Sequence, residues 1–173
     1  MMKLIMPTAE YAEEIRAYRQ AFLDAGDSMD GMGPLRRIED PLEWLRICES
    51  YRDPKTVPAG KVQATQFIYV REEDRRLVGM LQVRHYFNEY LEKYAGNIGY
   101  SVRPDERRKG YAKGMLQAAL PFCRKIGLEK MLVSCLVENE GSRRTILSCG
   151  GVYESTVHIP EENVDLERYW IVL

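Results

Sequence analysis

A short segment between residues 103 and 113 collects charges that could bind an anion. Its cations are Arg103, Arg107, Arg108, Lys109 and Lys113, and its acids are Asp105 and Glu106, which leaves a local charge of +3. Gly110 lies within the segment, and an apolar pattern with helical spacing follows directly. The free N–H groups and dipole of a helix start, beside a glycine that allows close approach, attract pyrophosphate. The segment therefore predicts a site for a phosphate-bearing cofactor.

The segment differs from the two common phosphate-binding loops. A Walker loop requires GxxxxGK[ST], whereas here Lys109 precedes Gly110 and no Ser or Thr follows. The GxGxxG dinucleotide pattern is not matched either. The predicted phosphate site therefore depends on the local order of strand, loop and helix.

An expected strand and an expected helix flank this loop. Residues 97 to 102 are a strand-like run that ends at Arg103-Pro104, because proline lacks the N–H that an interior strand needs. Residues 110 to 126 place apolar side chains on one helical face and stop at Gly127. Pro121 is expected to kink this helix or split it near its last turn.

The rest of the chain supplies the other elements of a mixed sheet. Further strands are expected at 3–6, 66–71, 76–86, 130–137, 152–159 and 168–173, and further helices from Thr8 to Gly26, from Asp40 to 52 and at 139–149. This order predicts an α/β (α+β) fold with six or seven strands and about four helices. The length fits one domain of residues 1–173.

The ordered motifs resemble the GNAT superfamily of acetyl-CoA-dependent N-acetyltransferases. The signature [Q/R]-x-x-G-x-[G/A] is matched by R-x-x-G-x-A at 107–112, after a strand that ends in V-x-P. An N-x-x-S sequence at 139–142 then opens a helix that closes in Gly150-Gly151. The resemblance covers residues 66 to 152 and is closest to bacterial acetyltransferases of unassigned substrate. It implies the GNAT fold, with a V-shaped splay between the central strands.

The resemblance also implies acetyl-CoA as the cosubstrate, without a metal. Backbone N–H groups of the loop would bind pyrophosphate, the end of the splayed strand would pair with pantetheine as an added strand does, and the next helix start would hold the cofactor arm. The matching residues are Arg108, Lys109, Gly110, Tyr111 and Ala112 for the backbone cradle, Arg107 and Lys113 for added charge, Val102 and Arg103 for pantetheine, and Asn139 and Ser142 for the arm.

The acid that protonates the leaving thiolate departs from the common pattern. Amine attack on a thioester needs an oxyanion donor, a route for the amine proton and a proton source for sulfur. Many relatives carry a tyrosine seven residues after the asparagine, but that position is Ile146 here. The substitutes are Ser142, Tyr153 and Cys149. Alternatively the thiolate leaves unprotonated, because free thiol pKa values lie near ~8.5.

Three side chains are candidates for the base, namely Glu89, His85 and Glu138. His85 ends a strand, and an imidazole pKa near ~6.5 suits proton transfer, although a structural histidine is the alternative. Glu89 lies in the loop before the splayed strand, where the acceptor is expected, with a solvated surface charge as its alternative. Asn97 lies where a polar group could order a water. Glu89 and Asn97 are therefore the substrate candidates, and water-mediated deprotonation is the expected route.

Composition limits the partners. The 173 residues have a net charge of -1, which gives no bulk attraction to nucleic acid or to an anionic membrane. No apolar run approaches the ~20 residues of a membrane span, and the short apolar N-terminus is no signal peptide, so we expect a cytoplasmic protein. Its four cysteines have no CxxC spacing and are expected to be buried free thiols. A homodimer through the final strands, as often seen in the superfamily, stays open.

Three hypotheses follow for the function. The first is an N-acetyltransferase that moves the acetyl group directly to a primary amine of a small molecule or peptide. The second is a non-catalytic CoA or acyl-CoA sensor module, because the usual tyrosine is missing. The third is a nucleotide-phosphate enzyme, which predicts ATP binding that survives CoA competition. An acidic loop could recognise a cationic amine or merely supply helix caps and surface charge; its members are Asp27, Asp30, Glu39 and Asp40.

Overall fold

One mixed sheet of seven strands organises the chain. The computed structural model describes residues 1–173, and neighbouring strands follow the order β1-β2-β3-β4-β5-β7-β6. The strands are β1 (Met2–Ile5), β2 (Ala64–Arg71), β3 (Arg76–Arg84), β4 (Ile98–Val102), β5 (Lys130–Leu136), β6 (Val152–Ile159) and β7 (Val164–Val172). The helices are α1 (Ala12–Ala25), α2 (Pro41–Arg52), α3 (Tyr111–Lys125) and α4 (Glu140–Ser148), with short turns η1 (Ala9–Tyr11), η2 (Leu91–Ala95) and η3 (Pro104–Glu106). The predicted fold class is confirmed.

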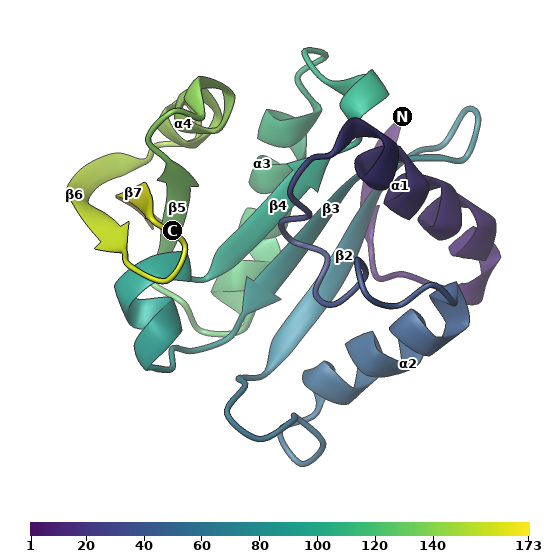
Figure 1. Ribbon diagram of the computed structural model, residues 1–173, viewed down its shortest axis with the longest axis horizontal. Coiled ribbons are helices and arrows are strands. Elements are labelled where there is room, and N and C mark those ends of the chain that lie inside the picture. The colour runs from purple at the N-terminus through teal and green to yellow at the C-terminus, as the bar shows by residue number, and fades with distance from the viewer.

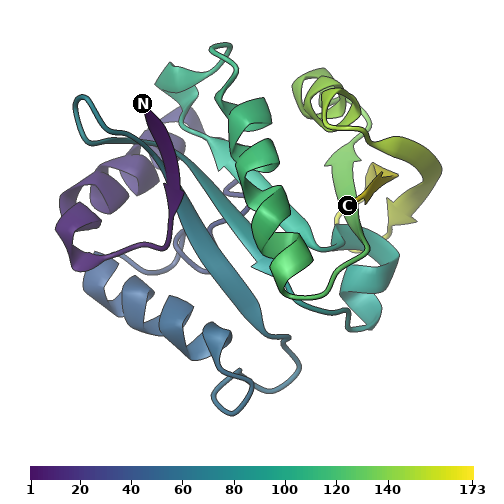
Figure 2. The ribbon, with the colours of Figure 1, turned by 180° about the vertical axis from the view of Figure 1, so that it is seen from behind.

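Helices cover both faces of the sheet. α1 and α2 lie on the face turned toward the viewer in Figure 1, and α3 crosses the opposite face, which Figure 2 shows. Strand alternation divides the core between them, because successive side chains point to opposite faces. Met80 packs with Trp44 under α1 and α2, whereas Leu81 packs with Met115 under α3. None of the helices combines the length and apolar character needed to cross a membrane.

Local sequence signals explain most helix boundaries. The Asp40 side chain accepts a hydrogen bond from the Leu42 N–H (2.9 Å) and Pro41 takes the first position of α2, as predicted. The expected Thr8 cap is wrong, because Thr8 makes no side-chain cap and the chain forms η1 before α1 begins.

Pro121 was expected to kink or to split α3, and the split does not occur. α3 continues without a break from Tyr111 to Lys125. Pro121 itself lies on the exposed side of the helix, while Ala119 and Cys123 on either side of it are fully buried against the sheet. Packing of this apolar face offsets the hydrogen bond that the proline cannot donate.

The splay expected between the central strands is present. The only ladder pair between β4 and β5 joins Ile98 to Val133. The two strands are held together at one end of the splay by Asn97, which lies just before β4 and is 2% exposed. Its N–H donates to the Leu132 carbonyl (2.8 Å), and its Oδ1 accepts from the Leu132 N–H (2.9 Å). Its Nδ2 donates to the Arg84 carbonyl (3.2 Å). Beyond this point the two strands separate (Figure 1).

We expect Asn97→Ala to lower the free energy of unfolding by about 2–4 kcal/mol, because it leaves a buried N–H and a buried carbonyl without their side-chain partners. Urea unfolding followed by circular dichroism measures this change. An unchanged midpoint combined with a raised KM for the acceptor would instead support the predicted contact between Asn97 and substrate.

Candidate active site

β4 presents unpaired main-chain groups to the splay. Near its two ends it bonds β3, through the Asn97 carbonyl (2.7 Å) and the Arg103 N–H (2.9 Å). Hydrogen bonding alternates along an antiparallel strand, so the N–H and C=O groups of Tyr100 and Val102 point away from β3, toward β5. β5 has already diverged there, and only the Val102 carbonyl has a partner, the Arg107 Nε (3.1 Å). This edge can accept an added strand-like ligand.

The predicted pairing of the Arg103 main chain with pantetheine is wrong. Its N–H donates to the Val78 carbonyl, and its own carbonyl accepts from the Glu106 N–H (2.9 Å). Its side chain turns toward α1, 3.5 Å from a Glu14 carboxylate oxygen. Tyr100 takes its place on the splay. Strand alternation counted from the Arg103-Pro104 boundary was the sequence signal that could have found it.

The loop before α3 has the unsatisfied donors that an anion site needs. The main-chain N–H groups from Arg107 to Gly110 donate to no protein acceptor, and no side chain caps the first turn of α3. Gly110 has a φ of +81°, and a Cβ at this position would meet nothing within 4 Å. Arg108 also has a positive φ, +62°. The N–H groups of the loop are therefore available to a ligand, and the missing side chain of Gly110 leaves room for its approach.

Internal ion pairs occupy most of the loop's cations. Arg107 pairs with Asp27 (2.8 Å), and Lys109 pairs with Glu106 (2.7 Å). The Arg107 guanidinium also lies over the ring of Phe22, 5.7 Å from its centre. The cations of the 103–113 segment that form no ion pair are Arg108 and Lys113. The free charge therefore differs from the prediction, which assigned it to Arg107 and Lys113.

A buried carboxylate, Glu106, stabilises the loop before α3. Glu106 is 4% exposed and accepts hydrogen bonds from Arg76 Nε (2.6 Å), Lys109 Nζ (2.7 Å) and Arg71 Nη1 (3.1 Å). Burial alone would raise the pKa of Glu106, but these three bonds outweigh it and lower the pKa to about 2. The loop thus keeps its shape through an ionised residue beneath it.

Glu106 should make stability depend on acid. Because its folded-state pKa lies below its ordinary value near 4.5, its stabilising contribution is complete above pH ~4.5 and is lost as the pH falls toward 2. We expect the wild type to lose on the order of 3 kcal/mol more than Glu106→Gln over this range. Chemical denaturation of both proteins between pH 5 and pH ~2.5 measures the difference. Parallel pH profiles for the two would contradict it.

A hydroxyl pair bridges the splay at the start of α4. Tyr100 Oη lies 2.6 Å from Ser142 Oγ. Burial raises the pKa of Tyr100, and the bond to Ser142 opposes this only in part, so the phenol stays protonated. The Asn139 side-chain oxygen accepts from the Ser142 N–H (3.0 Å) as the cap of α4, which leaves its Nδ2 for a ligand. Ile146 is fully buried in the core and faces no ligand.

The other candidate acids are placed differently. Tyr153 is 54% exposed on β6 and shares a hydrogen bond with Thr156 (2.8 Å). The Cys149 thiol lies 3.9 Å from the Lys113 carbonyl, and burial raises its pKa. Neither has a hydrogen-bond partner in the splay, so Ser142 is the predicted acid that pairs with a second hydroxyl there.

The structure does not bring the candidate bases together. His85 lies on the α3 face, where its Nε2 contacts Thr65 Oγ1 (2.9 Å) and its ring packs edge-on to Phe122, and burial lowers its pKa. Glu89 and Glu138 are exposed and form no ion pair. This placement leaves water as the expected carrier of the amine proton, as the sequence suggested.

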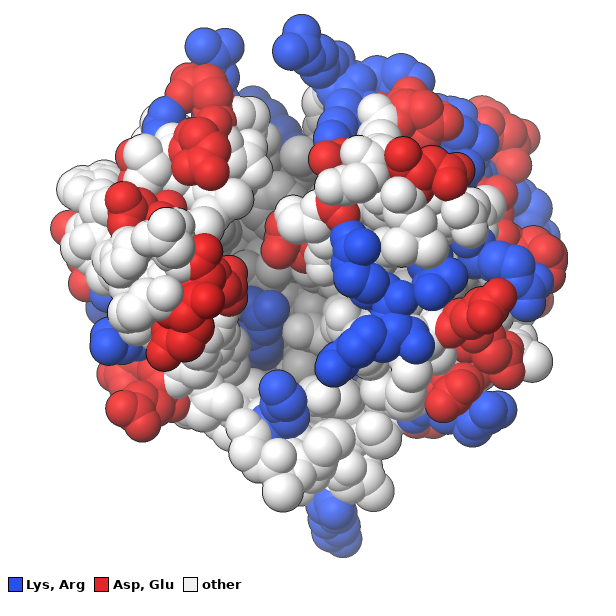
Figure 3. Space-filling model, in the orientation of Figure 1, with Lys and Arg blue, Asp and Glu red and all other residues white.

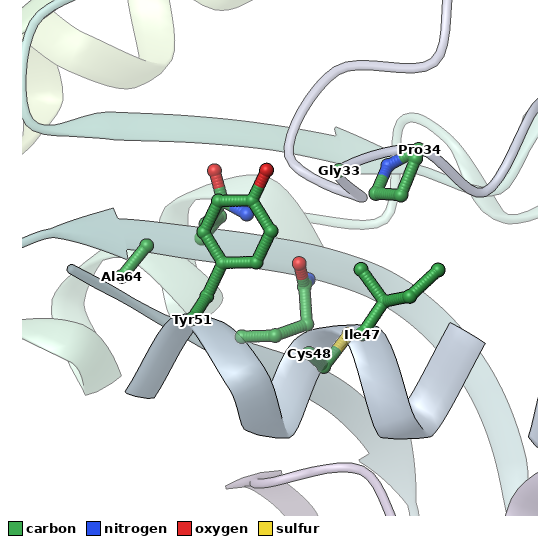
Figure 4. Close-up of a pocket in the computed structure, with 8 residues that line it drawn as sticks. Gly33, Pro34, Ile47, Cys48, Tyr51 and Ala64 are labelled. Carbon is green, nitrogen blue, oxygen red and sulfur yellow. The ribbon is translucent and has the colours of Figure 1, made fainter. Parts of the chain in front are cut away.

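A separate small pocket lies between α2 and the sheet (Figure 4). Burial raises the pKa of its Cys48 thiol to about 12, so this cysteine is unreactive near neutral pH. All four cysteines are free, as predicted, but only Cys123 and Cys135 are buried; Cys48 and Cys149 are partly exposed. The lining residues are Gly33, Pro34, Ile47, Cys48, Tyr51, Ala64, Gln66 and Gln82. None is a carboxylate, a cation or a histidine, so this pocket has no charged group for catalysis.

These features define an acyltransferase scaffold, and the comparison with protein families agrees. The model of the acetyltransferase (GNAT) family matches residues 35–150, which contain β4, the loop, α3 and α4. The chain belongs to this family, as the R-x-x-G-x-A motif predicted. No curated protein sequence matches it.

Solved structures share the whole fold at low sequence identity. The microcin C7 self-immunity acetyltransferase MccE, in complex with acetyl-CoA and AMP, has a TM-score of 0.72 and 19% identity over 99% of this chain and 92% of that one. RimJ of Mycobacterium smegmatis, in complex with CoA-disulfide, has a TM-score of 0.71 and 21% identity over 99% and 81%. The spermidine/spermine N-acetyltransferase SpeG of Vibrio cholerae has a TM-score of 0.65 and 16% identity over 99% and 95%. At these identities the likeness shows the fold.

Proposed function

We propose that this protein transfers an acetyl group from acetyl-CoA directly to a primary amine of a small molecule or peptide. The observation that carries the proposal is the presence of two sets of unpaired main-chain donors, one in the loop at 107–110 and one at the free edge of β4. Family membership supports it, as do the complexes of MccE with acetyl-CoA and of RimJ with CoA-disulfide. Acetyl-CoA would supply the acyl group as an activated thioester.

The chain's own residues suit this cofactor. The N–H groups of Arg108 to Ala112 would bind the pyrophosphate, with the unpaired Arg108 and Lys113 side chains adding charge. The main chains of Tyr100 and Val102 would pair with pantetheine. Asn139 Nδ2 remains available for the cofactor arm. Together these groups hold a long anionic ligand with its arm in the splay.

Proton movement at the splay falls to the hydroxyl pair. Ser142 Oγ can donate a proton to a leaving sulfur, and Tyr100 Oη, 2.6 Å away, can replace that proton. The proton that the amine nitrogen loses passes to water, and the pair regains one from water, so the protons balance. This arrangement supplies the acid that the buried Ile146 cannot provide.

Thiol release from acetyl-CoA across a panel of primary amines tests the proposal. Amine-dependent release together with an acetylated product supports it. Ile146 favours a second candidate, a CoA-binding sensor without turnover, which predicts CoA affinity in calorimetry and no thiol release with any amine. Absence of CoA affinity would contradict both candidates.

A further inference from the structure

Arg84 places a cation at the point where β4 and β5 part. Its side chain points to the α1 and α2 face, because it pairs across the ladder with Ala64, which lines the pocket under α2. The guanidinium lies over Gly99, and a Cβ on that glycine would be 3.0 Å from Arg84 Nη2. Gly99 directly precedes Tyr100, whose main chain faces the splay. The Arg84 guanidinium therefore contacts the residue that precedes Tyr100, on the sheet face opposite α3.

This cation has no counterion in the protein. No carboxylate oxygen lies within 4.0 Å of it, and its only hydrogen bonds are long ones from Nη1 to the carbonyls of Ala95 (3.3 Å) and Gly96 (3.4 Å). Burial lowers its pKa, while Asp30 acts from a distance to raise it. A guanidinium carries five N–H donors in a fixed fork, so Nε and Nη2 remain for a ligand. The side chain is only partly exposed, so its charge loses part of its hydration, and a bound anion would compensate for that loss.

The surroundings suit an acceptor that enters from this face. Figure 3 shows a hollow between the α1–α2 side and the β5–β7 side of the molecule, with Lys or Arg atoms visible inside it. The loop after α1 forms one wall, because a Cβ on Gly31 would overlap the Gly99 carbonyl oxygen (2.4 Å). The acids of this loop are partly committed elsewhere: Asp27 pairs with Arg107, and Asp40 caps α2. Two of the four carboxylates that could have recognised a cationic amine are therefore already engaged within the protein.

We propose that Arg84 binds an anionic group of the acceptor, so that the substrate is a primary amine that also carries a carboxylate or a phosphate. The inference depends on the proposed function, since it names the acceptor of that reaction. The guanidinium fork matches either group with two parallel hydrogen bonds. Its charge also lowers the pKa of an ammonium bound beside it, which favours the neutral amine that attacks.

Matched amines test the proposal in the wild type. The pairs are β-alanine against ethylamine, phosphoethanolamine against ethanolamine, and a free amino acid against its amide. The anionic member of at least one pair should have a kcat/KM about 30–100-fold above its partner. The first and third pairs report a carboxylate and the second a phosphate, so the preferred pair identifies the group.

Substitution of Arg84 then assigns that preference. Arg84→Gln should lower kcat/KM by about 30–100-fold for the anionic acceptor and by less than about threefold for the uncharged one. Arg84→Lys should retain part of the preference for the anionic acceptor. Arg16→Gln, which removes an exposed cation from α1, is the control and should leave both values unchanged. Equal turnover within every pair, or an equal loss for both members in Arg84→Gln, overturns the role of Arg84 and leaves the acetyltransferase proposal intact.

Binding separates the two proposals. Calorimetry with the N-acetylated forms of the same pairs, on CoA-saturated wild type and Arg84→Gln, requires no turnover. Arg84-dependent binding of the anionic form without any thiol release would support the anion site and contradict the acetyltransferase. If neither form binds and no anionic amine is acetylated, the anion site is wrong.

Discussion

Gly110→Glu is expected to abolish detectable CoA binding while the protein stays folded. The position is open, so the new carboxylate would occupy the space in which the phosphates are proposed to lie. A like charge about 4 Å away costs roughly 4 kcal/mol at an effective dielectric constant near 20, which corresponds to a loss in affinity of about 10²- to 10³-fold. Isothermal titration calorimetry with CoA measures the affinity, and circular dichroism checks the fold.

The chain offers a matched control for this substitution. Gly127 follows α3 at its other end, has a φ of +90°, and has equally open space where a Cβ would be. Gly127→Glu therefore introduces the same charge and the same backbone strain far from the loop. It should bind CoA as the wild type does. Unchanged CoA affinity in Gly110→Glu would remove the loop from the cofactor site.

Ser142→Ala is expected to lower kcat by about 10²-fold, since a positioned general acid contributes at least this much. Tyr100→Phe should lower kcat by about tenfold, because it removes the second hydroxyl while keeping the ring. CoA affinity should change by less than about threefold in both variants, because Tyr100 would bind the cofactor through its main chain and Ser142→Ala keeps the N–H that orients Asn139 toward the cofactor arm. Steady-state kinetics with the best acceptor, together with calorimetry, separates kcat from binding.

Tyr153→Phe is the matched control for the hydroxyl pair. It removes a tyrosine hydroxyl that lies on the exposed surface of β6, and kcat should not change. A normal kcat in both Ser142→Ala and Tyr100→Phe would instead favour the alternative in which the thiolate leaves unprotonated. A loss in Tyr153→Phe alone would move the acid to β6.

The elements were predictable because they depend on neighbours in sequence. Helical spacing of apolar residues located α3, and the Asp40-Pro41 pair located the start of α2. The prediction failed at Thr8, where a short helical turn replaces the cap, and at Pro121, where burial of the helix face outweighs a missing hydrogen bond. Neither the packing energy nor the preceding turn can be inferred from the local residue types alone.

The site was less predictable than the elements. The loop and its glycine follow from a motif, but Arg103 and Tyr100 exchanged their expected places because strand register decides which main-chain groups are free. The free cation also changed, because Asp27 of the distant α1 side pairs with Arg107. The spacing of residues within one segment does not predict ion pairs with a distant segment.

The sequence by itself determined the family, the anion-binding loop and the absence of the usual tyrosine, because a motif of consecutive residues records what the local backbone must do. Only the tertiary structure decided which charges stay free and that Tyr100 meets Ser142 across the splay. It also decided that Arg84, where β4 and β5 part, has no counterion. The physical reason is that ion pairing, burial and main-chain satisfaction are settled between segments that lie far apart in the chain, and the chemistry of this site depends on all three.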